Sequence, residues 1–76
     1  MKNTITPMED YSYISKNIKN FRKRLKLRQS DMAEMLGVSQ ATISNWENGK
    51  KTLYLHDAMG VIEILGMDIL KKQNYF

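Results

Sequence analysis

The sequence predicts an all-α fold of five short helices, and three observations lead to this prediction. Apolar residues recur at three- and four-residue spacing along most of the chain. No stretch alternates apolar and polar residues as a half-buried strand would. Glycines and capping residues divide the chain into pieces of helical length. A chain of 76 residues is expected to form one domain, with residues 1–5 loose and a compact part over about 14–70.

The first helix has two candidate starts. In the segment TPME, Thr6 is a candidate N-cap, Pro7 suits the first helical position, and Glu9 completes a capping box. These signals predict a start at Pro7, and a start near Ile14 is the alternative. In both cases the helix is expected to end near Leu25. Its inward face is an apolar stripe of Tyr11, Ile14, Ile18, Phe21 and Leu25.

Four further helices follow, at residues 29–36, 40–48, 55–65 and about 69–74. Gly37, Gly49 and Gly66 stand directly after the first three, and glycine readily adopts the positive φ that ends a helix. Ser39 and Asp68 precede two of these helices as N-caps.

The composition argues against several classes of protein. The chain has no cysteine, so neither a disulfide nor a thiolate metal site is available. The single His56 and the scattered carboxylates suggest no zinc site and no Ser-His-Asp arrangement. No segment is long and apolar enough to span a bilayer, and the first residues lack the apolar core of a signal peptide. We therefore expect a soluble, cytoplasmic domain without a catalytic site, metal, cofactor, small-molecule ligand or membrane partner.

Positive charge is concentrated in one segment of a chain whose formal net charge is +4. Between residues 16 and 28 there is no acid, and the cations are Lys16, Lys19, Arg22, Lys23, Arg24, Lys26 and Arg28. A solvated helix face is one interpretation of this run. A surface for nucleic acid or another polyanion is the other.

The helix expected at 40–48 carries an unusual polar face. At 100° per residue, Ile43 and Trp46 point towards the core. The opposite arc holds Gln40, Ala41, Ser44, Asn45 and Asn48, with Thr42 at its edge. A solvent-facing helix would normally carry Lys and Glu, which are better helix formers. Short amides instead match adenine N6 and N7, and alanine can contact a thymine methyl. Taken alone, the arc favours an ordinary polar surface, and a surface that reads the edges of DNA bases is the alternative.

The segment QSDMAEMLGVSQATISNWENGK, residues 29–50, contains a helix, a tight turn at Gly37 and a second helix. Its pattern consists of Gln29, Met32-Ala33, Leu36 to Ser39, Ile43-Ser44 and Glu47 to Lys50. With this set in register, the chain resembles the phage-repressor (Cro/cI, XRE-type) helix-turn-helix family over about residues 14–70. The resemblance implies a compact five-helix, lambda-repressor-like DNA-binding domain whose second and third helices form the helix-turn-helix.

The same resemblance implies roles for individual residues. Base edges would be read by Gln40, Ala41, Ser44 and Asn45. The DNA backbone would be contacted by Gln29, Ser39, Thr42, Asn48, Lys50 and Lys51. Gln29 would meet a phosphate at the amino end of its helix, where free N–H groups and the helix dipole favour an anion. Arg22 and Glu47 would form a structural ion pair.

Two positions depart from the family pattern. Arg28 stands where the family usually has a Ser or Thr cap, so a cap of about 1 kcal/mol is lost and a cation lies at the positive end of a helix. Facing a phosphate, Arg28 would be a further backbone contact. Leu53-Tyr54 replaces the family's Pro-Ser entry to the fourth helix, so Thr52 is an alternative cap there.

We expect a sequence-specific regulator of transcription, a repressor, that reads the major groove of double-stranded DNA with the helix at 40–48. One helix of this length reads few base pairs, so a homodimer on a palindromic operator is expected, with half-sites about one turn apart. Residues 71–76, with Tyr75 and Phe76, are candidate dimer contacts, and a frayed terminus is the alternative.

Other functions are less favoured. An antitoxin or other protein-interaction module with the same fold is the main alternative, but only residues 1–13 and 71–76 are spare for gripping a toxin. An enzyme would need a nucleophile, a base and an orienting group that the sequence does not combine. RNA binding is not favoured, because the sequence suggests no exposed aromatic pair on which bases could stack. Trp46 is expected in the core.

Overall fold

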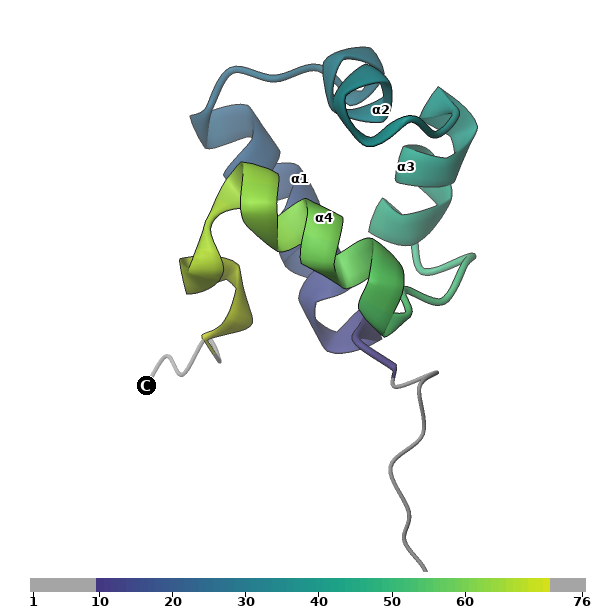
Figure 1. The fold of residues 1–76 in the computed structure, drawn as a ribbon, viewed down its shortest axis with the longest axis vertical. Coiled ribbons are helices and arrows are strands. Elements are labelled where there is room, and N and C mark those ends of the chain that lie inside the picture. The colour runs from purple at the N-terminus through teal and green to yellow at the C-terminus, as the bar shows by residue number, and fades with distance from the viewer. Residues whose placement is uncertain (1–9, 72–76) are drawn as a thin grey trace, which may run out of the picture.

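The protein is seen here as a computed structural model, which describes residues 10–71. The α-helices of these residues are α1 (Ser15–Arg24), α2 (Gln29–Leu36), α3 (Gln40–Glu47) and α4 (Leu55–Leu65). Two short 3₁₀ helices flank them, η1 (Ser12–Ile14) and η2 (Met67–Leu70). Figure 1 shows α4 crossing α1, with α2 and α3 side by side at one end. The prediction of an all-helical fold is confirmed for the described residues.

The predicted bounds of α2 and α4 agree with the structure, and α3 ends one residue earlier than predicted, at Glu47. Gly37 ends α2 with a φ of 72°, and the N–H of Val38 donates to the carbonyl of Ala33 at 3.0 Å. Gly49, with a φ of 74°, ends α3 in the same way. Both glycines occupy a left-handed position that a side chain would strain.

The early start of the first helix is wrong. Asp10 forms an isolated antiparallel bridge with Tyr54, and the N–H of Tyr11 donates to the carbonyl of Leu53 at 2.7 Å. These backbone bonds tie the segment to the loop before α4, so regular helix begins only at η1. The alternative start near Ile14 is correct within a few residues. The capping box proposed for Thr6 and Glu9 lies outside the described residues.

Among residues 10–71, the predicted fifth α-helix is not found. Its described part is the 3₁₀ helix η2, and Lys71 leaves the helical region with φ −70° and ψ 135°. Asp68 lies inside η2, whose N-cap is Gly66. Ile69 is fully buried but Met67 is 70% exposed, so the segment offers one firm anchor instead of an apolar stripe that would sustain a longer helix. The predicted residues 72–74 lie outside the described part.

Two smaller expectations fail. Leu25, predicted to face the core, is 51% exposed because α1 ends at Arg24 and the chain turns through Lys26, which has a φ of 60°. Thr52 does not cap α4, whose N-cap is Tyr54 without any side-chain capping bond. Tyr54 instead takes part in the bridge to Asp10.

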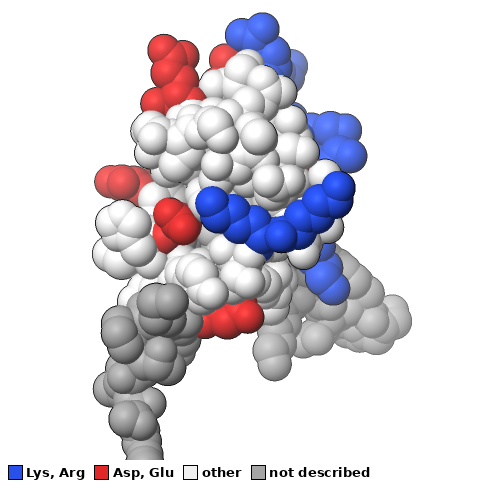
Figure 2. All heavy atoms as spheres, turned by 90° about the vertical axis from the view of Figure 1, so that its right-hand side faces the viewer, with Lys and Arg blue, Asp and Glu red and all other residues white. Residues whose placement is uncertain are grey.

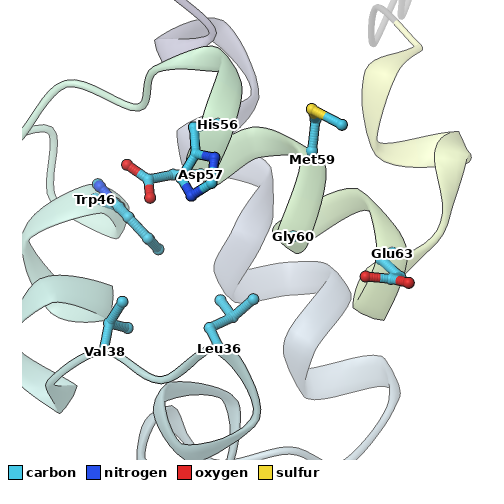
Figure 3. Close-up of a pocket in the computed structure, with 8 residues that line it drawn as sticks. All are labelled: Leu36, Val38, Trp46, His56, Asp57, Met59, Gly60 and Glu63. Carbon is cyan, nitrogen blue, oxygen red and sulfur yellow. The ribbon is translucent and has the colours of Figure 1, made fainter.

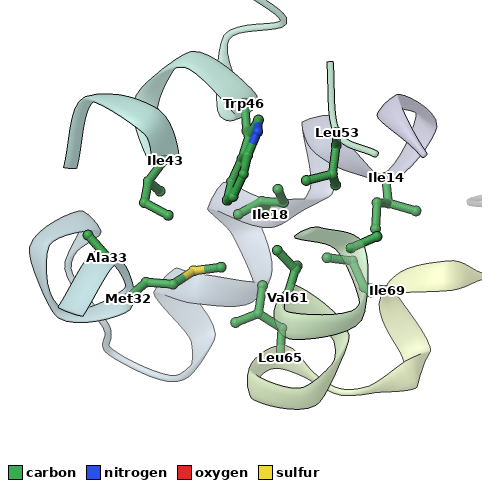
Figure 4. Packing of buried hydrophobic residues seen from close by; sticks show 11 residues of the cluster. Ile14, Ile18, Met32, Ala33, Ile43, Trp46, Leu53, Val61, Leu65 and Ile69 are labelled. Carbon is green, nitrogen blue, oxygen red and sulfur yellow. The ribbon is translucent and has the colours of Figure 1, made fainter. Parts of the chain in front are cut away.

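The core is formed by one apolar cluster that joins all the helices (Figure 4). Ile14 and Ile18 come from η1 and α1, and Figure 4 shows Trp46 from α3 next to Ile18. The remaining core members are Met32, Ala33, Ile43, Leu53, Ala58, Val61, Leu65 and Ile69. No helix in residues 10–71 has the length and apolar character needed to cross a bilayer.

Candidate nucleic-acid interface

Helix α3 is held on one side and exposed on the other. Ile43 is fully buried and Trp46 is 1% exposed, so both anchor α3 to the core. The side chain of Ser39 accepts a hydrogen bond from the N–H of Thr42 at 3.1 Å and caps the helix. These contacts fix which face of α3 looks outward.

The outward face carries the uncharged arc that the sequence singled out. Gln40, Ala41 and Asn48 are exposed, whereas Ser44 and Asn45 are half-buried. The amide of Asn48 donates to Ser44 Oγ at 3.3 Å. The side-chain amide of Asn45 makes no hydrogen bond within the described part of the chain. The arc thus presents amide and hydroxyl groups with unused hydrogen-bonding capacity to an incoming ligand.

Positive charge lies beside this arc. Lys50 and Lys51 are exposed in the turn after Gly49, where both backbone N–H groups donate to the carbonyl of Asn45, at 2.8 and 3.2 Å. Figure 2 shows the side of the molecule that carries α3, with Lys and Arg across the middle and along one flank and most acids on the other flank. The charge distribution therefore gives this face a basic flank and an acidic flank.

Gln29, at the start of α2, lies between two residues of α3. Its Nε2 donates to Glu47 Oε1 at 3.0 Å, and its Oε1 accepts a longer bond from Gln40 Nε2 at 3.4 Å. The contact orients Gln40, a residue expected to read bases, from the neighbouring helix.

Glu47 also receives the guanidinium of Arg22. Arg22 Nε donates to Glu47 Oε2 at 2.7 Å, and Arg22 Nη2 donates to Glu47 Oε1 at 3.2 Å. The third guanidinium nitrogen, Nη1, donates to the carbonyl of Leu27 at 2.8 Å. The two side chains are only 8% and 3% exposed. This pair joins α1, the loop before α2 and the end of α3.

Arg28, the N-cap of α2, is not an unpaired cation. Asp31 accepts the backbone N–H of Arg28 at 2.8 Å and two guanidinium bonds at 3.1 Å. These bonds lower the pKa of Asp31 and raise that of Arg28. The carboxylate restores part of the missing cap and neutralises the charge at the helix end. This role of Asp31 was not predicted, although an acid three residues after the cap position is its signal in the sequence.

The described part of the chain offers no cluster of metal ligands. No group of three or more His, Asp or Glu side chains there could hold a metal ion. The chemistry that the α3 face offers is hydrogen bonding and electrostatic attraction.

Sequence comparison agrees with this geometry. The sequence model of a family described as "Helix-turn-helix" matches residues 18–71, well over half of the chain. The chain therefore belongs to this helix-turn-helix family, whose XRE-type repressors it was found to resemble.

One curated relative is a protein of Archaeoglobus fulgidus, provisionally named as an HTH-type transcriptional regulatory protein. It is 41% identical over 58 residues, which are 76% of this chain and 18% of the relative. The chain thus spans less than a fifth of the length of that relative.

Solved structures share the fold at low sequence identity. Hydroxypropylphosphonic acid epoxidase from S. wedmorenis is 23% identical, with a TM-score of 0.68 over 88% of this chain and 36% of that chain. A chain from a HipA-HipB-O2-O3 complex is 22% identical, with a TM-score of 0.58 over 100% of this chain and 94% of that chain. Since part of an enzyme shares this fold, these likenesses show the fold alone.

Proposed function

We propose that this domain binds double-stranded DNA sequence-specifically and represses transcription. The observation that carries the proposal is the outward arc of α3, which presents uncharged hydrogen-bonding groups while Ile43 and Trp46 fix the helix from behind. An α-helix fits the major groove, where such groups distinguish base pairs.

Base reading falls to the residues on this arc, Gln40, Ala41, Ser44 and Asn45. Gln40 lies on the first turn of α3, the end that enters the groove in this docking mode. Its bond with Gln29 restricts the amide, which reduces the entropy lost when two bonds form with an adenine. The small side chain of Ala41 allows close approach.

Backbone contacts would surround the reading residues. Lys50 and Lys51 are exposed next to α3 and carry charge towards a phosphate. Arg28 is 80% exposed in its side chain, so it can contact a phosphate while it stays paired with Asp31. The remaining proposed backbone contacts are Gln29, Ser39, Thr42 and Asn48.

A homodimer on a palindromic operator is part of the proposal. α3 has 8 residues, so a single domain reads only a short site. Two domains related by a two-fold axis would place their α3 helices in successive major grooves, about one helical turn apart. Of the candidate dimer contacts at residues 71–76, residues 72–76, with Tyr75 and Phe76, lie outside the described part of the chain.

Selection of bound duplexes from a random pool tests the proposal. We expect an enriched palindrome whose half-sites are centred about 10 base pairs apart. On that site the affinity should fall with salt along a log–log slope on the order of −5 to −7, from about six to eight released counterions per dimer. A pool without enrichment would refute sequence-specific binding, and a slope near zero would refute the backbone contacts.

A further inference from the structure

A groove lies between α4 and the turn from α2 to α3, apart from the proposed base-reading residues. It encloses about 400 Å³. Figure 3 shows Leu36, Val38 and Trp46 along one wall, with α4 forming the other. Gly60 allows the two walls to approach, because a Cβ there would lie 2.7 Å from Leu36 Cδ2. The groove therefore has an apolar floor that is part of the fold.

The rim of this groove on α4 is acidic. Asp57 and Glu63 line it, and neither forms an ion pair within residues 10–71. Asp31, Glu47 and Asp68 are each paired with a cation, and Asp10 and Glu34, which do not line the groove, form no ion pair among the described residues. Two free carboxylates in a chain of net charge +4 repel DNA and favour a cationic occupant.

The spacing of the lining residues indicates the shape of the occupant. His56, Met59 and Glu63 are three and four residues apart on α4, so the groove follows two turns of that helix, about 10 Å. A second helix can lie along such a groove with anchors at the same spacing. Met59 is 61% exposed, and its flexible thioether adapts to apolar partners.

Trp46 supplies an independent observation. Its indole N–H is buried and has no hydrogen-bond partner among the described residues. An unmade hydrogen bond of this kind is costly, and few occur in native proteins. Trp46 also lines the groove, so its indole group lies beside the position that an occupant would take.

We infer that this groove docks an amphipathic helix of a protein partner, with apolar anchors on the floor and Lys or Arg against Asp57 and Glu63. A second copy of the chain fits less well. Among the described residues, Leu25 is an exposed apolar residue between two cations that form no ion pair, Arg24 and Lys26. The Arg24 guanidinium lies over the Phe21 ring at 4.7 Å. Docking of that corner would offer the groove one apolar side chain instead of an apolar stripe at helical spacing. It would also cover part of the basic segment.

The probe for the test is a synthetic Leu/Lys amphipathic peptide about four turns long, with a Leu/Glu peptide of the same pattern as control. Trp46 is the only tryptophan, so its indole N–H gives a single, assignable NMR signal. We expect the Leu/Lys peptide to shift this signal and the Met59 methyl signal until both reach saturation. The shifts should occur both in the free protein and in the protein bound to the operator duplex. The Leu/Glu peptide should bind at least about tenfold more weakly.

Charge removal completes the test. The double variant Asp57→Asn, Glu63→Gln should bind the Leu/Lys peptide about fivefold more weakly at low salt. Asp68→Asn, an exposed acid outside the groove, should bind as the wild type does. Equal melting temperatures would show that the variants are folded.

Four results would overturn the inference. The peptide could shift α3 signals alone, or bind the double variant unchanged. The duplex could shift the groove signals directly, making the groove a DNA contact. The same signals could move with protein concentration without peptide, which would identify a second copy as the occupant. If the selection of duplexes found no DNA binding, the proposed function would fail, but the peptide-binding measurements on the groove would still stand.

Discussion

Two arginine–carboxylate pairs lie close to Gln29. They contain the same chemical groups but differ in sequence separation and in the exposure of their side chains. Arg22 and Glu47 are 25 positions apart in sequence, with side chains 8% and 3% exposed. Arg28 and Asp31 are 3 positions apart, with side chains 80% and 32% exposed. Both pairs are joined by two guanidinium bonds, in the range 2.7–3.2 Å. Burial, and not bond length, therefore distinguishes them.

The difference in burial gives the pairs different functions. Removing one partner of the buried pair leaves a charge without water or a counter-ion, which is strongly unfavourable. Breaking the exposed pair lowers the free energy of unfolding only slightly, because water solvates both charged groups. The buried pair thus fixes the position of α3 against α1, while the exposed pair only organises the start of α2.

Glu47→Ala is the change with the largest expected effect. It leaves the Arg22 guanidinium buried with only the Leu27 carbonyl as acceptor, so we expect a loss of about 3–5 kcal/mol in unfolding free energy. Urea denaturation followed by circular dichroism measures it. Asn45→Ala, also on α3 but without a side-chain hydrogen bond among the described residues, is the matched control and should change stability far less. If Glu47→Ala and Asn45→Ala lowered the unfolding free energy by equal, small amounts, the Arg22–Glu47 pair would not be what holds α3 in place.

Gln40→Ala extends the comparison to DNA, because Gln40 reaches the buried pair through Gln29. We expect a loss of about 1–3 kcal/mol on the preferred operator and relaxed preference at one symmetric pair of positions. Binding to the operator and to its single-base variants measures both effects. Lys50→Ala should instead weaken every sequence alike, since a phosphate contact carries no base information. If Gln40→Ala also weakened all sites equally, Asn45 or Ser44 would be the better candidate reader.

Gln29→Ala tests the link between the buried pair and the reading residue. It removes one hydrogen bond to Glu47 but leaves the Arg22 bonds in place, so we expect a loss of about 1–2 kcal/mol in stability. Gln29→Glu keeps the shape but brings a second carboxylate to Glu47, so its loss at neutral pH should exceed that of Gln29→Ala. A smaller loss for Gln29→Glu would mean that the side chain at position 29 faces water.

The sequence predicted those parts of the fold in which local signals and packing agree. α2 and α4 combine an apolar face with a glycine directly after the last turn, and their bounds were predicted correctly. The false early start came from a local capping pattern at Thr6 and Pro7. Backbone bonds from Tyr11 and Asp10 to the loop before α4 override that pattern, and such distant contacts leave no periodic trace in the sequence.

The candidate site shows the same division. The polar arc of α3 follows from helical spacing alone, but the contacts of Gln29 with Gln40 and Glu47 depend on how α2 packs on α3. The pairing of Asp31 with Arg28 is local and could have been found from its three-residue spacing. The groove beside α4 could not, because its two walls are brought together only by the tertiary fold.

The smallest expected effect on stability belongs to the exposed pair, and Asp31→Asn isolates its charge. Asparagine keeps an oxygen that can accept the Arg28 N–H, so only the ionic part is lost. Asp31→Ala removes the acceptor as well and should therefore destabilise more. Urea denaturation at low and high salt compares the three proteins. The difference between wild type and Asp31→Asn should shrink with salt, whereas the loss caused by Glu47→Ala should not.

The pH dependence of this small difference has a definite sign. Hydrogen bonds from Arg28 lower the pKa of Asp31 in the folded chain below its ordinary value of 3.8. The charged carboxylate therefore stabilises the folded state above the unfolded pKa, and this contribution is lost as the pH falls through the lower, folded pKa. The pKa of Asp10 is lowered too, by its bonds from Ser12, but Asp10 is present in both proteins and its contribution cancels in the comparison. Wild type and Asp31→Asn should thus differ slightly at neutral pH and converge on acidification. A difference that grew towards low pH would mean that Arg28 does not hold the Asp31 carboxylate in solution.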